Sequence, residues 1–302
     1  MTNKNASSGH KLGQLVGDWF EEYFVFPLLQ KIGKKLNLFV DSRFINRSVR
    51  SEKIIWNDLD GNKVDYDAVL ELGGSDSTIG IPVAFIECFW RRGSRHSKDK
   101  ARDDSGKLLP MRDTYPTARF LGIISAGDFT APARELIRTR NIDLFYIPKA
   151  KIIQSFESCG MQMDYPDQLS EEQKYEIARS FEAKFTDTKK SQVKEMLYNA
   201  IGKTAIKGYL DKVKSTLCSL PQEIRFILRH NSKPISFESI AKANDFLCHP
   251  NFKMDSPLET YIYEITYTDG SEFSSEVKTI DELKNLHQQI QKLEEHMRSL
   301  QT

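Results

Sequence analysis

The stretch VDYDAVLELGGSDSTIGIPVAFIECFW, residues 64–90, joins an alternating run to a nearly all-apolar one. KIIW at 53–56 precedes it across the turn signal DLDGNK, and Asp-Gly and Gly-Asn pairs favour tight turns between β-prone runs. We therefore expect residues 53–72 to form a hairpin. Residues 80–90 have the composition of a strand that is buried on both faces of a sheet.

The segments on either side of this stretch predict an α/β fold. Apolar residues recur at helical spacing over 12–36, interrupted by Pro27, which indicates an opening amphipathic helix. Further along, ARFLGIISAGDF (118–129) and IDLFYIP (142–148) are typical of strands, and APARELIRTR (131–140) between them is typical of a helix. This order of strand, helix and strand favours a sheet with parallel crossovers.

The chain changes character after about residue 166. Residues 169–185, 190–217 and 221–230 show helical patterns with lysine-rich outer faces. Residues 233–247 are expected to form one further helix, and an ordinary helix is favoured over one helix of a helix-turn-helix reader because no second helix follows at the right distance. YIYEITYTDGSEFSSEVK (261–278) has the pattern of a hairpin turning at Asp-Gly. These features predict a second, smaller helical or α+β region.

The last segment has the spacing of a short coiled coil, with apolar residues three or four apart between Gln, Lys and Glu. Its apolar positions are Leu283, Leu286, Ile290, Leu293, Met297 and Leu300. The stripe is equally consistent with self-association and with packing on its own domain. The predicted organisation is therefore a domain at 1–160, an accessory region for recognition or dimerisation at 161–278, and a coiled-coil tail at 279–302.

The composition excludes several classes of protein. The net charge is +1, so binding to a polyanion requires a local patch. No run approaches the roughly 18 apolar residues of a membrane span, and the opening MTNKNASSGH lacks the apolar core of a signal peptide, so we expect a cytoplasmic protein without membrane association. The four cysteines form no CxxC pair, and Cys248-His249 has no second pair at ligand spacing, which argues against structural zinc.

Two carboxylates are expected at one edge of the sheet. Asp67 lies within the second strand of the stretch and Glu87 near the end of the third, so adjacent strands can bring them together. Burying Glu87 among apolar residues costs several kcal/mol unless a positive group neutralises it. Mg²⁺, which prefers hard oxygen ligands and retains positions for water and phosphate, would do so, and Mn²⁺ is a substitute.

A run of basic residues follows Glu87 within about twenty positions. Its members are Arg91, Arg92, Arg95, Lys98, Lys100, Arg102 and Lys107, and Asp99, Asp103 and Asp104 offset only part of their charge. Taken alone, such a run is most often a solvated face. Its continuity with a buried carboxylate favours a phosphate-facing patch, in which we expect Arg91, Arg92, Arg95, His96 and Lys100 to contact nucleic acid.

At these residues the chain resembles the PD-(D/E)XK nuclease superfamily, the restriction-endonuclease-like fold. The family pattern has an Asp on one strand and an acidic residue, one spacer and a Lys on the next. VDYDAVL supplies Asp67 and FIECFW supplies Glu87, and the order of elements over residues 12–148 matches. The resemblance implies a mixed sheet flanked by helices and a metal-dependent nuclease site. It also implies an extra acidic metal ligand on the first helix, for which Glu21 is the candidate.

The chain departs from the family pattern at Phe89, which stands where the Lys is expected. The missing charge can come from Arg91, on the same strand face, or from Lys98 and Lys100 in the following helix. We favour Lys98, because a flexible amine can orient or activate the attacking water and Arg cannot lose a proton.

Other polar residues compete for roles in this site. Alternation places Asp65 on the same strand face as Asp67, so that one could bind metal and the other support it. Glu71 shares that face but is expected to be exposed near the strand end. His96 could contact phosphate or carry a proton, or have no chemical task.

The resulting hypothesis is a metal-dependent endonuclease that hydrolyses DNA phosphodiester bonds, of a restriction-like or defence-associated type. A homodimer would fit the cutting of both strands. The alternative is a non-catalytic DNA-binding or assembly protein that retains the fold. A nucleotide hydrolase is disfavoured, because the sequence lacks a GxxxxGK[ST] loop, a GxGxxG after a strand and a GxSxG elbow.

Overall fold

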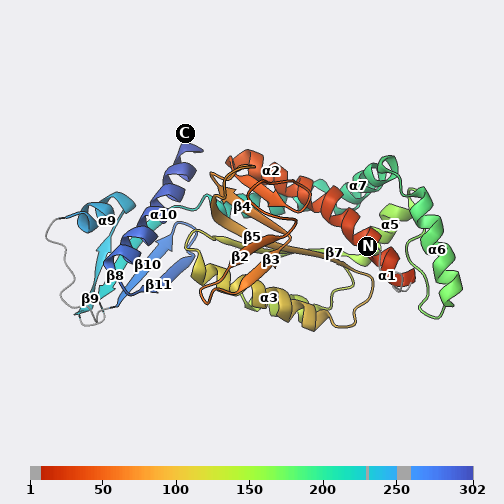
Figure 1. Ribbon diagram of the computed structural model, residues 1–302, viewed down its shortest axis with the longest axis horizontal. Helices are drawn as coiled ribbons and strands as arrows, with labels where there is room; N and C mark the ends of the chain where they lie inside the picture. The colour runs from red at the N-terminus through yellow and green to blue at the C-terminus, as the bar shows by residue number, and fades with distance from the viewer. Residues whose placement is uncertain (1–7, 229–230, 250–259, 302) are drawn as a thin grey trace.

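A computed structural model describes residues 8–228, 231–249 and 260–301 (Figure 1). Most of the opening segment on which the expected absence of a signal peptide rests, residues 1–7, lies outside this part. No helix in the described ranges is both long and apolar enough to cross a bilayer.

A five-stranded mixed sheet forms the centre of the larger part of the molecule. Its strands, in the order β1-β4-β5-β6-β7, are β1 (Phe39–Ser42), β4 (Ala68–Leu72), β5 (Ile81–Arg91), β6 (Phe120–Gly127) and β7 (Asp143–Pro148). β4 runs antiparallel to β1 and β5, whereas β5, β6 and β7 are parallel. The predicted α/β class and the parallel crossovers are therefore confirmed.

The predicted hairpin is divided between two sheets. β2 (Ile54–Asn57) pairs with β3 (Lys63–Tyr66) in a separate ribbon, and the chain then passes through Asp67 into β4 of the central sheet. The expected single strand over residues 64–72 is thus interrupted at Asp67, because its two halves pair with different partners. Asp65 and Asp67 do not share one continuous strand.

Helices cover both faces of the central sheet (Figure 1). One face packs against α1 (Ser8–Trp19), the π-helix η1 (Phe20–Val25), α2 (Phe26–Leu36) and α5 (Lys149–Glu157). The other packs against α3 (Ser97–Thr114) and α4 (Ala131–Thr139). Pro27 does not interrupt the opening helix, since it lies in the first turn of α2, where a missing N–H is tolerated.

Side chains of β5 alternate between these two faces. Phe85 and Phe89 belong to the core beneath α3, whereas Ile86 and Cys88 belong to the core beneath the opening helices. The positions from Pro82 to Phe89 are all buried, as expected for a strand covered on both sides. Glu87 therefore points toward α3, because it shares the parity of Phe85 and Phe89.

The remaining elements form three helices and a second, antiparallel sheet. The helices α6 (Glu171–Lys184), α7 (Asp187–Ile201) and α8 (Lys203–Leu217) add buried residues to the core beneath α1 and α2. The second sheet, in the order β11-β10-β8-β9, lies at one end of the molecule (Figure 1). It comprises β8 (Pro221–Leu228), β9 (Asn231–Phe237), β10 (Tyr261–Tyr267) and β11 (Glu272–Val277), with α9 (Ile240–Leu247) and α10 (Ile280–Ser299) packed on it.

Two helix predictions in this region are wrong. Residues 221–228 form β8, in which Ile224 and Phe226 are buried on one side with a period of two, and residues 229–230 of the predicted helix lie outside the described ranges. The predicted helix 233–247 begins as part of β9 and becomes helical only at Ile240. The hairpin around Asp269-Gly270 is confirmed.

The apolar stripe of the last helix packs within the chain. Leu283, Leu286 and Ile290 of α10 join the core of the second sheet. Leu293 and Met297, further along the same helix, join the core of the central sheet instead. α10 therefore links the two cores, and the coiled coil is not confirmed, because these five residues pack within the chain and only Leu300, directly after the helix, is exposed among the six predicted positions.

Candidate functional site

The interruption at Asp67 fixes a carboxylate at the start of β4, between β1 and β5 of the central sheet. The register of β4 against β5 begins at Ala68 opposite Ile86, so the N–H of Cys88 extends past the end of β4. Asp67 Oδ2 accepts a hydrogen bond from this N–H at 2.7 Å. The pairing holds Asp67 beside β5 and leaves its second oxygen available for a ligand.

Glu87 is buried beneath α3 and is bound by a lysine of that helix. Its residue exposure is 1%, and Lys107 Nζ lies 3.0 and 3.2 Å from its two carboxylate oxygens. The same Nζ also donates to the backbone oxygen of Asp65 at 3.3 Å. The sequence places Lys107 in the basic run but does not identify it as a partner of Glu87.

The inner face of α3 presents charged groups to the sheet. Lys100, Asp104 and Lys107 are spaced four and three residues apart, which aligns them on one helix face. Lys100 Nζ lies 2.7 Å from Asp104 Oδ1 and 5.1 Å from the centroid of the Phe89 ring. An ammonium group from α3 thus stands over Phe89, the position at which the family resemblance expects a lysine.

Glu21 approaches Asp67 from the opposite face of the sheet. It lies in η1, and wide π-helical turns occur frequently at functional sites. Arg43 holds its carboxylate at 2.9 Å. One carboxylate oxygen of Glu21, one of Asp67 and the Sγ of Cys88 all lie within 4.8 Å of one another. Glu21 and Asp67, both predicted metal ligands, are therefore brought together.

Burial and repulsion between neighbouring carboxylates raise the pKa values of Glu21 and Glu87, which favours their protonated forms. Burial, then the charge of Asp67, raises the pKa of Glu21 to about 8 against the opposing effect of Arg43. Burial, then the charges of Asp67 and Asp104, raises the pKa of Glu87 to about 8 against the opposing effect of Lys107. The lysine and arginine side chains only partly compensate the concentrated negative charge.

The carboxylates of this region are of the kind that a hard divalent cation prefers. Glu21 and Asp67 offer carboxylate oxygens on one face of the sheet, whereas Glu87 lies toward α3 on the other face and is not part of the group formed by Glu21, Asp67 and Cys88. Asp104 has no exposed surface, and burial raises its pKa. Its Oδ2 has no hydrogen-bond partner among the described residues. A cation near these groups would supply the positive charge that the side chains lack.

The raised pKa values predict how stability depends on pH in the metal-free protein. Below about 4.5, Glu21 and Glu87 are protonated in both folded and unfolded states, and as the pH rises toward 8 only the unfolded state ionises freely. The free energy of unfolding should therefore fall between these pH values. Urea unfolding in EDTA measures this decrease, which Glu87→Gln should reduce. A slope that is unchanged in Glu87→Gln would contradict the assignment.

The predicted lysine and most of the basic run lie away from the carboxylates. Lys98 is exposed and makes no ion pair or hydrogen bond with the described residues. Lys107 binds Glu87 and Lys100 binds Asp104 instead. Arg92 pairs with Asp164 and Asp167 and lies 4.2 Å from the centroid of the Tyr165 ring.

The loop before α3 holds the other predicted phosphate contacts. Arg91 donates to the backbone oxygen of Arg95 at 2.7 Å, and His96 pairs with Asp99 at 3.1 Å. Arg95 is exposed.

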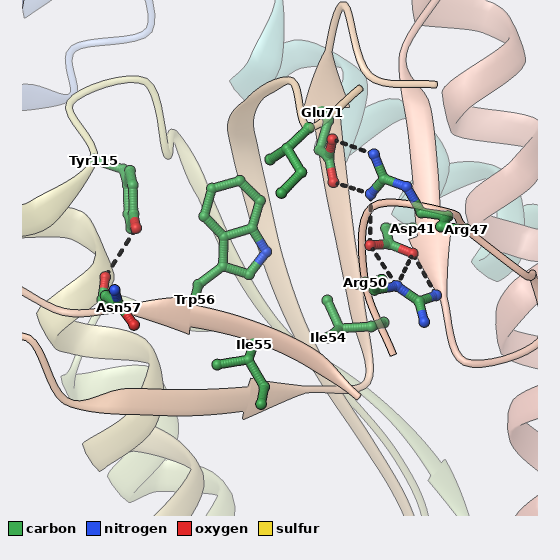
Figure 2. Close-up of a pocket in the computed structure, with 10 residues that line it drawn as sticks. Asp41, Arg47, Arg50, Ile54, Ile55, Trp56, Asn57, Glu71 and Tyr115 are labelled. Atoms are coloured by element: carbon green, nitrogen blue, oxygen red, sulfur yellow. Dashed lines mark hydrogen bonds and ion pairs between the residues drawn. The ribbon is translucent and has the colours of Figure 1, made fainter. Parts of the chain in front are cut away.

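The two competing acidic residues are bound elsewhere. Asp65 forms a half-exposed ion pair with Lys53 at 3.2 Å. Glu71 is fully buried, contrary to the expected exposure, and binds the Arg47 guanidinium through both oxygens (Figure 2). Glu71 therefore belongs to a buried ion cluster with Asp41, Arg47 and Arg50.

A groove leads from Asp67 toward this ion cluster. Its volume is about 590 Å³, and its lining includes Arg43, Lys53, Asp65 and Asp67. It adjoins a smaller pocket of about 200 Å³ beside Trp56, because Arg47, Arg50 and Ile54 line both (Figure 2). An extended ligand could thus reach Asp67 along the side of the β2–β3 ribbon.

Comparison with known proteins gives no functional information. No family model and no curated protein matches the chain. A solved structure described as that of a protein of unknown function, AF1548, is similar over 63% of this chain and 98% of its own, at 15% identity and a TM-score of 0.30.

Proposed function

We propose that this protein is a metal-dependent nuclease that hydrolyses DNA phosphodiester bonds, of a restriction-like or defence-associated type. The proposal rests chiefly on one observation: Asp67, directly before β4, lies next to Glu87 of the neighbouring strand β5, and Lys107 binds Glu87 at 3.0 Å. Buried carboxylates that lie close together, have raised pKa values and contact a positively charged side chain are frequent at catalytic sites.

Glu21, Asp67 and Glu87 are the residues that would hold Mg²⁺ or Mn²⁺. Such an ion supplies a polarised phosphoryl group, an activated water and a stabilised leaving oxygen when it is bound. Asp67 is held for this role by its hydrogen bond from the N–H of Cys88. Glu21 is held by Arg43.

Lys107 replaces Lys98 as the proposed catalytic lysine. Its ammonium already contacts both oxygens of Glu87, and its side chain is 39% exposed, so that a phosphate oxygen can reach it. A lysine amine can orient water and can exchange a proton, which a guanidinium cannot. Lys100 contributes a second positive charge over Phe89 and beside Asp104.

The DNA backbone would be contacted from the loop before α3. Arg95 is exposed there, His96 and Lys98 are exposed beside it, and Arg91 stabilises the loop through backbone contacts. Arg92 is less suited, because it is already paired with two aspartates.

We also propose a homodimer, since double-strand cleavage needs two sites. The interface would lie outside the apolar stripe of α10, which is buried within the chain.

The alternative is a DNA-binding or assembly protein without catalysis. Phe89 favours it, because this side chain is buried in the core and cannot replace the expected lysine directly. The acidic residues oppose it, since a protein that only binds DNA gains nothing from burying Glu21, Glu87 and Asp104 near Asp67 with raised pKa values, a pattern that is frequent at catalytic sites.

The deciding assay is cleavage of supercoiled and linear DNA with Mg²⁺, Mn²⁺ or EDTA. We expect nicking or cutting only with metal. In the same assay, Lys107→Ala should lower the rate by roughly a hundredfold, whereas Lys98→Ala should leave it within about twofold. Binding without cutting under every metal would favour the alternative. Equal losses in both variants would contradict the role of Lys107.

A further inference from the structure

A cavity large enough for one ion lies behind Asp67, on the face of β5 opposite to Glu87. Its volume is about 10 Å³, close to that of a single water-sized sphere. The polar side chains in its lining are Glu21, Ser42, Asp67 and Cys88. The rest of the lining is apolar and comes from Val25, Phe26, Leu29, Phe44 and Ala68, so the cavity is a small recess with a polar side.

Cys88 provides an unsatisfied buried group at this cavity. Its exposure is 6%, and its thiol forms no hydrogen bond with the described residues. Strand alternation directs it away from Glu87 and toward η1. Its Sγ lies within 4.8 Å of ligand oxygens from both Glu21 and Asp67. The recess thus combines one soft donor with two hard donors.

We propose that Cys88, Glu21 and Asp67 form a binding site for a thiophilic divalent cation such as Zn²⁺ or Cd²⁺. Zinc binds thiolate sulfur and carboxylate oxygen at about 2.0 to 2.3 Å, which places tetrahedral ligands roughly 3.5 Å apart. The three atoms, which lie within 4.8 Å of one another, would have to approach by up to about 1.3 Å to reach this spacing. Binding exchanges the protons of the Cys88 thiol and, at neutral pH, of the Glu21 carboxyl group for bonds to the metal, and these protons pass to solvent. Mg²⁺ does not favour a thiolate ligand.

The site would regulate the proposed nuclease, and this part of the inference rests on the proposed function. Glu21 and Asp67 are shared between the thiophilic site and the proposed Mg²⁺ site. A cation held by Cys88 would therefore draw the Asp67 carboxylate away from Glu87. Zn²⁺ or Cd²⁺ should inhibit cleavage in the presence of Mg²⁺, and the inhibition should depend on Cys88.

Cadmium absorption tests binding without any need for activity. The full chain carrying Cys159→Ser, Cys218→Ser and Cys248→Ser retains Cys88 as its single thiol. Titration of this metal-free protein with Cd²⁺ should produce an ultraviolet thiolate-to-cadmium charge-transfer band that saturates at one equivalent. The band should be absent after further substitution of Cys88→Ser or Cys88→Ala. Absence of a band in the parent, or its persistence without Cys88, would overturn the proposal.

A second variant keeps the thiol and removes a carboxylate. Asp67→Asn should weaken Cd²⁺ binding at least about tenfold in the same titration, whereas Asp65→Asn, on the neighbouring ribbon, should not. Equal affinity in both variants would exclude Asp67 as a ligand. Asp67→Asn also keeps the proposal testable if the Cys88 variants fold poorly.

The two proposals fail separately. A cadmium band in a protein that never cleaves DNA would support the cation site and contradict the proposed nuclease function. Mg²⁺-dependent cleavage that Cd²⁺ inhibits equally with and without Cys88, each measured against the same variant's own activity, would support the nuclease and remove the regulatory site.

Discussion

Glu87→Gln and Asp67→Asn should each lower the rate of metal-dependent DNA cleavage by at least about a hundredfold, or ~2.7 kcal/mol of transition-state stabilisation. Both amides keep the shape of the side chain and remove the negative charge that would hold the cation. In Glu87→Gln the amide oxygen can still accept a hydrogen bond from Lys107, so the fold should be preserved. Single-turnover cleavage of supercoiled plasmid, with circular dichroism of each variant, measures the loss.

The matched control is Asp65→Asn. This carboxylate lies two residues from Asp67 but belongs to the β2–β3 ribbon, where its side chain is 43% exposed and pairs with Lys53. We expect its rate to stay within about twofold of the wild type, because exposed ion pairs contribute little. A loss as large as that of Asp67→Asn would identify Asp65 as a metal ligand instead. Full activity in Glu87→Gln would contradict the proposed role of Glu87 in holding the metal.

The sequence was sufficient for β4 to β7 of the central sheet because these strands carry strong local patterns, whereas the short strand β1, which follows α2, was not predicted. Residues 81–91 are apolar on both faces, and β6 and β7 flank a helix with a clear start and end. The interruption at Asp67 could not be predicted, since VDYDAVLEL alternates continuously and only the pairing with β2 and β5 divides it. Residues 221–228 formed a strand because tertiary pairing with β9 and β10 outweighed a weak helical pattern.

The carboxylates were easier to predict than the lysine. Asp67 and Glu87 follow from position on adjacent strands, whereas the partner of Glu87 depends on how α3 is rotated against the sheet. α3 is polar on most sides, so its sequence gives no apolar stripe to set that rotation. The spacing of Lys100, Asp104 and Lys107 was the one available signal. Similarly, an apolar stripe with three-four spacing in α10 fits a coiled coil and in-chain packing equally well.

The second large effect concerns the buried ion cluster of Figure 2. Arg47 Nη1 lies 2.6 Å from Asp41 and 2.7 Å from Glu71, and the three side chains are at most 2% exposed. Replacing Glu71 by Ala removes one partner and leaves buried positive charge in excess. We expect the free energy of unfolding to fall by about 3 to 5 kcal/mol. Urea unfolding at neutral pH measures this change.

Two variants separate the loss of a buried partner from the loss of any ion pair. Asp211→Ala breaks a pair with Lys207 whose side chains are 50% and 79% exposed, and should leave the stability nearly unchanged, because exposed ion pairs contribute little. Glu71→Gln keeps the volume and its hydrogen-bond acceptor, so it should lose less than Glu71→Ala. Because Arg47 also lines the groove that reaches Asp67, loss of the cluster should weaken DNA binding as well. A Glu71→Ala protein as stable as Asp211→Ala would contradict this prediction. It would mean that water replaces the missing carboxylate and that backbone contacts alone hold the segment carrying Arg47 against β4.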